Sequence, residues 1–279
     1  MTESMTVRRA LVQSGLVPID AHVLLAHVLE RGRAWLVAHA DDALPAEQVA
    51  AFLALACRRR DGEPIAYLTG VREFWGMPLT VSPAVLIPRP ETETLVEVAL
   101  TLLPADRAIR VLDLGTGSGA VALALARELP RATIVATDVS AAALEVARTN
   151  ARRLGVGNVT WLASDWYAGV GLAERFDVIV SNPPYVDADD PHMAAGDLRY
   201  EPVGALTAGA DALLALRRVI VGATPFLAPG GSVAVEHGYD QAETVRSLFG
   251  DAGFTEIRTT RDIAGVPRVT SGRHAPTSS

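Results

Sequence analysis

Apolar residues recur at helical spacing in the first quarter of the chain. Two segments, residues 21–30 and 46–60, carry them three and four positions apart, as one face of a helix requires. No strand-like alternation occurs before residue 71. The pattern predicts a small N-terminal helical domain over residues 1–70.

The pattern changes over residues 71–90. Aromatic and β-branched residues are mixed there with Gly76 and four prolines, which predicts a β-hairpin linker. Residues 89–103 then place acidic side chains ahead of an apolar face, which predicts a helix. We expect this stretch to join the helical domain to a second domain that spans residues 91–274.

Seven short apolar runs dominate the second domain. We expect helices between the first six runs, the clearest at residues 140–155 and 241–253, and therefore a mainly parallel sheet that is covered on both faces. The connection between the last two runs is too short for a parallel crossover, so these two strands should be antiparallel. The expected strands are residues 109–115, 132–138, 159–165, 176–182, 231–238, 254–262 and 267–274.

Composition and charge narrow the class of protein. Hydrophobic residues make up 49% of the 279 residues, charged residues 20%, and the net charge is −7. The chain has no basic arm, so we expect no direct nucleic-acid partner. A single cysteine, Cys57, no apolar stretch of membrane-spanning length and no signal peptide indicate a cytoplasmic, soluble protein without a zinc cluster or other metal site. A monomer is the default expectation.

A glycine-rich loop follows the first strand of the second domain. Its glycines allow a sharp turn and let a ligand lie against the backbone. Gly115, Gly117 and Ala120 also fit the dinucleotide fingerprint, so this loop alone leaves open a nicotinamide or flavin enzyme and a methyltransferase. The candidate cofactor-binding residues here are Gly115, Thr116, Gly117, Ser118 and Gly119.

Acidic and aromatic residues end the next two strands. Asp138 stands where a carboxylate can accept hydrogen bonds from both ribose hydroxyls of an adenosine-type ligand. Asp165 and Trp166 follow the third strand, and they offer a carboxylate to the adenine amine and a flat face to its ring. Together with the glycine loop, these residues predict an adenosine pocket at the carboxyl edge of the sheet.

The fourth strand ends in Asn182, Pro183, Pro184 and Tyr185. The prolines stiffen the turn and donate no backbone hydrogen bond, which leaves the side-chain carbonyl of Asn182 and the main-chain carbonyl of Pro183 as acceptors. Two fixed acceptors suit a substrate that carries two hydrogens on one nitrogen, and Tyr185 can lie over a planar group. We therefore predict Asn182, Pro183 and Tyr185 as catalytic residues and the whole turn as substrate-binding.

These motifs together resemble a known family. "LDLGTGSG", "TD", "SDW" and "SNPPY" are similar to the motifs of class I S-adenosylmethionine-dependent methyltransferases. The flanking segments "EPIAYLTGVREFWGMPLTVSPAVLIPRPETE" and "VEHGYDQAETVRSLF" resemble the protein-glutamine methyltransferases that act on peptide chain release factors, the PrmC/HemK family. The similarity extends over residues 63–274.

The resemblance implies a fold, a cofactor and a substrate. The fold is a Rossmann-like seven-stranded sheet with one antiparallel strand and a small N-terminal helical domain that helps to hold the release factor. The cofactor is S-adenosyl-L-methionine, which leaves as S-adenosyl-L-homocysteine, with Asn182 also among its contacts. The substrate is the glutamine of the Gly-Gly-Gln loop of class 1 release factors, methylated on its side-chain amide nitrogen.

Two other functions fit part of the pattern. An adenine-N6 methyltransferase that acts on RNA or DNA would use the same turn, although the acidic charge disfavours it. A nicotinamide-dependent oxidoreductase would leave residues 182–185 without a role. No general base stands out, and the possible ones are His192, Asp197, Glu201 and His237.

Overall fold

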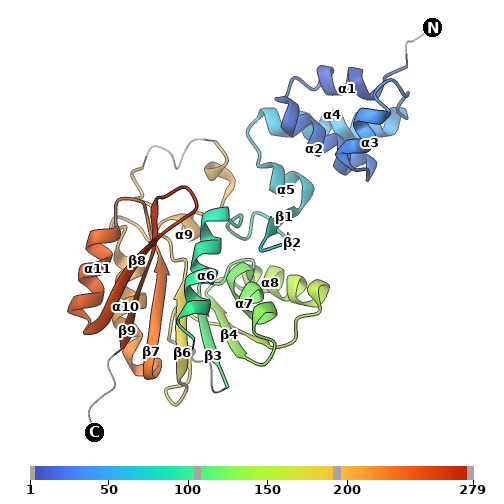
Figure 1. Cartoon of the computed structure of the whole chain (residues 1–279). Helices are drawn as coiled ribbons and strands as arrows, with labels where there is room; N and C mark the ends of the chain where they lie inside the picture. Colours follow the sequence, from blue (N-terminus) through green and yellow to red (C-terminus); the bar gives the residue numbers. More distant parts are fainter. Residues whose placement is uncertain (1–3, 104–107, 191–195, 275–279) are drawn as a thin grey trace. The chain divides into compact units, whose positions relative to one another are not determined.

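The computed structural model describes residues 4–103, 108–190 and 196–274 (Figure 1). The chain forms two compact units. The smaller unit comprises residues up to Val71 together with residues 196–200, and the larger unit comprises the remaining described residues. Each unit has its own hydrophobic core.

The smaller unit is helical. Its core consists mainly of aliphatic side chains around Phe52, which is fully buried. Residues 196–200 are fixed to this unit by Arg59, whose guanidinium donates to Asp20 at 2.7 Å and to Asp197 at 2.8 Å. The helices are α1 (Val7–Gln13), α2 (Pro18–Leu29), α3 (Arg33–Ala38), α4 (Ala46–Arg60) and α5 (Ile65–Thr69), and the 3-10 turn η3 covers Leu198–Tyr200.

A hairpin and a helix lead into the sheet. Strands β1 (Val71–Phe74) and β2 (Met77–Thr80) form a two-stranded sheet that buries Phe74 and Met77. The chain then forms the 3-10 turn η1 (Pro90–Thr92) and helix α6 (Glu93–Thr101). The proline at the start of η1 has its φ angle already set for a helical turn and needs no intrahelical partner for its nitrogen.

The seven-stranded sheet has the order β5-β4-β3-β6-β7-β9-β8. Pairing is parallel from β5 to β7, whereas β9 runs antiparallel to both β7 and β8. The expected antiparallel pairing of the last two strands is therefore confirmed. The strands are β3 (Arg110–Leu114), β4 (Thr133–Asp138), β5 (Val159–Ala163), β6 (Phe176–Ser181), β7 (Leu227–Glu236), β8 (Phe254–Arg261) and β9 (Pro267–His274).

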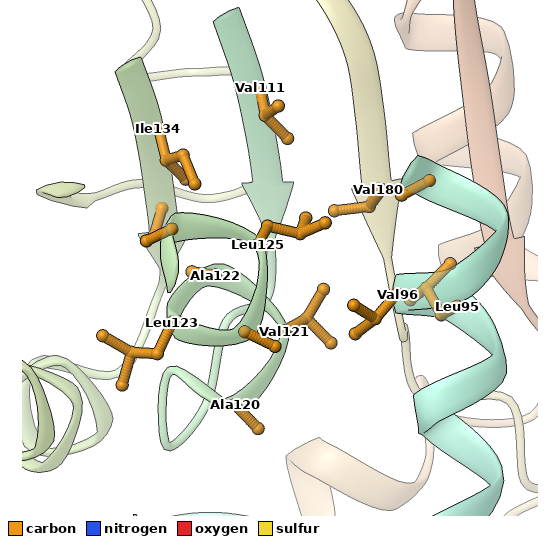
Figure 2. Packing of buried hydrophobic residues seen from close by; sticks show 14 of the residues in the cluster. Leu95, Val96, Val111, Ala120, Val121, Ala122, Leu123, Leu125, Ile134 and Val180 are labelled. Atoms are coloured by element: carbon orange, nitrogen blue, oxygen red, sulfur yellow. The ribbon is translucent and has the colours of Figure 1, made fainter. Parts of the chain in front are cut away.

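Helices cover both faces of this sheet. On one face, α6 and α7 pack on the strands, and Figure 2 shows Leu95 and Val96 of α6 and Val121 of α7 near Val180 of β6. On the other face, α10 and α11 bury alternate strand residues such as Leu112. The helices of this unit are α7 (Ala120–Glu128), α8 (Ala141–Leu154), α9 (Val203–Leu206), α10 (Leu214–Gly222) and α11 (Ala242–Asp251), with the 3-10 turn η4 at Thr224–Phe226.

One expected helix is not present. The connection between β5 and β6, residues 164–175, consists of turns rather than a helix. Two hydrogen bonds organise it: the Ser164 hydroxyl donates to the Trp166 carbonyl at 2.7 Å and accepts from the Gly169 amide at 2.8 Å. The prediction of a helix here was wrong because local side-chain hydrogen bonds and glycines stabilise turns in this segment.

Candidate active site

The carboxyl ends of four parallel strands meet at one cavity. Register pairs Leu114 at the end of β3 with Thr137 on one side and Ser181 on the other, so the residues that follow β3, β4 and β6 emerge together. The cavity has a volume of about 280 Å³. Its wall includes these sequence-predicted residues: Gly115, Thr116, Gly117, Ser118, Asp138, Asp165, Trp166, Asn182 and Pro184.

The glycine loop is shaped by backbone conformations that other residues avoid. Gly115, Gly117 and Gly119 have φ angles of 73°, 56° and 83°. A Cβ at Gly119 would also lie 3.1 Å from the Ala147 Cβ. Side chains are therefore disfavoured at these three glycines by backbone strain and, at Gly119, also by the packing of α7 on α8.

Asp138 holds the loop in place. Its Oδ2 accepts from the Gly117 amide and its Oδ1 from the Ser140 amide, each at 2.8 Å. Burial raises the pKa of Asp138, and these backbone hydrogen bonds counteract the increase. The Ser140 hydroxyl caps α8 by accepting from the Ala143 amide at 3.1 Å. Asp138 thus links the glycine loop to the start of α8 while its side chain forms part of the cavity wall.

Asp113 is a wall residue that the motif analysis did not select. It lies in β3 with 2% of its surface exposed, and the Thr116 hydroxyl donates to its Oδ2 at 2.6 Å. Burial raises the pKa of Asp113 to about 7. A carboxyl group among the apolar residues of the strand "RVLDL" was the available signal, because such a group needs a specific partner.

Trp166 forms an aromatic part of the wall. Its own φ of 49° is in the left-handed region, and a Cβ at Gly115 would lie 3.7 Å from its Cζ3. Left-handed backbone is costly for a bulky residue, and such strain is often found at binding sites. Asp165, directly before it, is exposed at the cavity. Together these two residues provide a flat face and an exposed carboxylate.

The Asn182 side chain is held by a residue far away in the sequence. Its Nδ2 donates to the Thr92 hydroxyl of η1 at 3.2 Å. This contact uses the donor side of the amide, so Oδ1 is the acceptor that the side chain can offer to a ligand. Asn182 and Pro184 are half-buried and form part of the wall.

Tyr185 is anchored away from the cavity wall. Its hydroxyl donates to Glu236 Oε1 at 3.0 Å, and its main-chain carbonyl accepts from Gln241 Nε2 at 3.0 Å. Burial raises the pKa of the Tyr185 phenol well above its usual value. Among the sequence-predicted residues, Tyr185, Pro183 and Gly119 do not contribute to the wall of this cavity.

The four possible general bases have different environments. Glu201 forms an ion pair with Arg89 at 2.5 Å, and Asp197 lies in the smaller unit beside Arg59. His237 is fully buried, contacts the Thr270 hydroxyl at 2.9 Å, and has its pKa lowered by burial. His192 lies outside the described residues.

Comparison with protein families identifies two regions. Residues 6–70 match the model of the PrmC N-terminal domain, and residues 92–209 match that of the methyltransferase small domain. The chain is similar to a release factor glutamine methyltransferase of Bordetella pertussis. The two are 52% identical over 262 residues, which covers 94% of this chain and 97% of the relative.

Solved structures with low sequence identity share the fold. The catalytic domain of hMettl16, in complex with a MAT2A 3'UTR hairpin, aligns with a TM-score of 0.57 at 14% identity, over 82% of each chain. The 16S rRNA N2 G1207 methyltransferase of T. thermophilus, in complex with AdoMet and guanosine, aligns with a TM-score of 0.53 at 23% identity. That alignment covers 73% of this chain and 49% of the other. The large unit therefore has the class I methyltransferase fold.

Proposed function

Because the chain belongs to the release factor glutamine methyltransferase family, we propose that it methylates the side-chain amide nitrogen of the glutamine in the Gly-Gly-Gln loop of class 1 release factors. The observation that carries the proposal is the orientation of the Asn182 amide in the cavity wall. Its nitrogen donates a hydrogen bond to the Thr92 hydroxyl, so its oxygen is the atom that can accept one from a substrate. An acceptor fixed in this way is what an incoming amide N–H requires.

The cavity wall suits S-adenosylmethionine. The cofactor carries a sulfonium, an ammonium group, a ribose and an adenine, and three carboxyl groups in the wall, Asp113, Asp138 and Asp165, can match its cationic and hydroxyl groups. Trp166 offers the adenine an aromatic face, and the glycine loop permits close approach. Bound there, S-adenosylmethionine would supply an electrophilic methyl group.

The turn at residues 182–185 would orient the substrate amide. An amide nitrogen is a poor nucleophile because its lone pair is delocalised into the carbonyl, so orientation and electrostatic stabilisation must supply much of the rate. We assign Asn182 Oδ1 as the acceptor of one hydrogen bond from the substrate nitrogen. The Pro183 carbonyl would accept the second. As the nitrogen–methyl bond formed and the sulfonium–methyl bond broke, fixed carbonyl dipoles would stabilise the positive charge that develops on that nitrogen, which would then lose one of its two protons.

The N-terminal unit would contribute to recognition of the release factor. Residues 6–70 match a domain model specific to this family, whereas the class I fold alone is shared with enzymes that act on RNA. A protein substrate offers a large surface beyond the reacting side chain, and binding of remote surface can be used to position the reacting group.

Mass spectrometry of the substrate loop tests this proposal. The protein is incubated with S-adenosylmethionine and a class 1 release factor, and the Gly-Gly-Gln peptide should gain one methyl group on the glutamine amide. Asn182→Ala should reduce the rate by about 100-fold or more, because the fixed acceptor is lost. The variant should unfold at a temperature near that of the wild type, which separates loss of the acceptor from loss of the fold.

Two controls make the outcome specific. A release factor in which the loop glutamine is replaced by alanine should accept no methyl group, and total RNA should accept none either. Methylation of adenine in RNA, with none on the release factor, would instead support the adenine-N6 function. Near-normal turnover by Asn182→Ala would show that the amide oxygen does not hold the substrate nitrogen.

A further inference from the structure

Asn150 is a polar side chain on the buried face of α8. It follows Ala143 and Ala147 at helical spacing, and 1% of its surface is exposed. Asparagine is a weak helix former, and a buried amide is costly unless it is hydrogen-bonded. The side chain therefore needs partners outside its own helix.

The Asn150 amide bonds two segments that are distant in the sequence. Its Nδ2 donates to the Ser118 carbonyl at 2.9 Å and to the Thr80 carbonyl at 3.0 Å, and its Oδ1 accepts from the Thr80 amide at 2.7 Å. These partners fix the orientation of the amide, because in the opposite orientation its oxygen would face two carbonyl oxygens. The side chain thus joins the glycine loop to the end of β2.

Both of these segments lead into the cavity wall. Ser118 is itself a wall residue, and the chain that follows Thr80 contributes several more, namely Ala84, Val85, Leu86, Pro88 and Arg89. Asn150 is not among the described residues that form the wall. It lies behind the wall and sets the distance between two parts of it.

The other part of the glycine loop has a different support. Residues 115–117 are held by β4, because the Thr137 carbonyl and the Asp138 side chain accept hydrogen bonds from their amides. The Ser118 carbonyl is held by Asn150 instead. Loss of the Asn150 side chain would therefore release the Ser118 end of the loop and leave the bonds to β4 in place.

We propose that Asn150 is a positioning residue for the cofactor, which fixes the Ser118 end of the glycine loop against the segment that follows β2. This inference rests on the proposed function, because that function places S-adenosylmethionine on the glycine loop. Asn150 touches neither cofactor nor substrate in this role. Its bonds do not extend to Asn182, so it should govern cofactor binding rather than the chemical step.

Asn150→Ala tests the proposal in the full-length enzyme. The substitution removes all the hydrogen bonds of the Asn150 amide and leaves the buried Ser118 carbonyl without this donor. The Kd for S-adenosylhomocysteine and the KM for S-adenosylmethionine should each increase by about tenfold. The kcat at saturating cofactor should stay within about twofold of the wild type. Isothermal titration calorimetry and steady-state kinetics with a release factor measure these quantities.

Asn158→Ala is the matched control for a purely structural role. The Asn158 Nδ2 also donates to main-chain carbonyls, but it does so at the far end of α7, to Ala126, Leu129 and Ala132 at 3.3, 3.1 and 3.2 Å. Both substitutions should lower Tm, whereas only Asn150→Ala should raise Kd. Wild-type Kd in Asn150→Ala, or an equal increase in Asn158→Ala, would overturn the proposal.

Arg153→Ala separates the glycine loop from the hairpin. The Arg153 guanidinium donates to the Thr80 hydroxyl at 2.6 Å, so its loss weakens the attachment of β2 to α8 and leaves the bond between Asn150 and Ser118 intact. We expect a wild-type Kd in this variant. The same increase in Kd as in Asn150→Ala would show that the attachment of β2, and not the bond to Ser118, determines cofactor binding.

Hydrogen exchange tests the proposal without a substitution at Asn150. If breaking the bond to Ser118 weakens cofactor binding, bound cofactor must disfavour the broken state by the same factor. The chain contains three asparagines, so ¹⁵N-asparagine labelling gives few side-chain NH₂ signals, and Asn158→Ala and Asn182→Ala assign two of the pairs. In the wild type, S-adenosylhomocysteine should slow exchange of the remaining Asn150 pair by about tenfold more than that of Asn158.

The outcomes of this measurement are distinct. Equal slowing at Asn150 and Asn158 would reflect stabilisation of the whole fold by the ligand and would overturn the positioning role. A wild-type protein that does not bind S-adenosylhomocysteine would overturn the cofactor assignment, and this proposal with it. Binding in the wild type without the differences described above would overturn this proposal alone.

Discussion

Asp113 and Glu236 are two buried carboxyl groups whose pKa values are raised to the same extent but which lie at different positions. Both lie in strands of the central sheet, with 2% and 1% of their surfaces exposed, and burial raises the pKa of each to about 7. Asp113 is part of the cavity wall, whereas Glu236 lies behind the substrate turn and contacts Tyr185.

The difference shows that position, rather than ionisation alone, decides what a buried carboxyl group does. A carboxylate in a cavity wall interacts directly with a cationic ligand, so its charge should govern cofactor affinity. A carboxylate behind the wall contacts no ligand and accepts a hydrogen bond from the Tyr185 hydroxyl, so its charge should leave cofactor affinity unchanged. The comparison therefore separates an effect on cofactor binding from an effect on the stability of the fold.

The largest expected effect is on cofactor affinity. Asp113→Asn removes the buried charge that would face the ammonium group of the ligand, and we expect the Kd for S-adenosylhomocysteine to increase by about 10- to 100-fold. Isothermal titration calorimetry measures this directly. Glu236→Gln is the matched control, and its Kd should equal that of the wild type. Equal effects of the two substitutions on Kd would contradict the separation of roles.

The second effect is the pH dependence of that affinity. Asp113 is protonated below about pH 7 in the free protein, so the Kd for S-adenosylhomocysteine should increase as the pH falls below this value, by at most about tenfold per pH unit. Glu236→Gln should retain this dependence and Asp113→Asn should lose it. A pH-independent Kd in the wild type would show that the charge of Asp113 does not interact with the bound ligand.

Strand-end positions account for how much of the site could be predicted from the sequence. Apolar runs that end in Asp138, Trp166 and Asn182 identify a common sheet edge, since parallel strands place their carboxyl ends together. The alternation of strands and helices wrongly predicted a helix within residues 164–175, where side-chain hydrogen bonds stabilise turns instead.

Contacts between distant segments could not be predicted in this way. Thr92 and Asn182 are 90 residues apart, and Tyr185 and Glu236 are 51 residues apart. Neither periodicity nor a short motif carries information on such pairs, because they are set by the packing of η1 and β7 beside β6. Asp113 is intermediate: its polarity within an apolar strand was visible, but its place in the wall was not.

The third effect is on stability. Because the pKa of Glu236 is raised on folding, the folded protein binds the proton more tightly than the unfolded chain. The free energy of unfolding should therefore decrease as the pH rises from about 4.5 to about 7, and remain constant above that range. Glu236→Gln should remove this contribution, which is at most about 3 kcal/mol for a shift from 4.5 to about 7, and so raise Tm at pH 8 relative to the wild type by several degrees.

Thermal unfolding followed by circular dichroism at several pH values provides this measurement. Asp177→Asn serves as the control, because Asp177 is also a buried carboxyl group in the central sheet. Its Oδ2 accepts a hydrogen bond from the Arg110 backbone amide, so this substitution should destabilise the protein. A lower Tm for Glu236→Gln at pH 8 would mean that its charged form is favourably bound in the fold, contrary to the raised pKa.

The smallest expected effect isolates one hydrogen bond. The Thr116 hydroxyl donates to Asp113 Oδ2 at 2.6 Å and lowers the pKa of that carboxyl group, while the charge of Asp138 raises it. Thr116→Val removes the donor and should move the midpoint of the pH-dependent Kd upward by less than about one pH unit. The contribution of Glu236 to the pH dependence of Tm should stay as in the wild type. A change in that contribution instead would show that the two carboxyl groups are coupled, and the distinction between the wall and the region behind it would no longer hold.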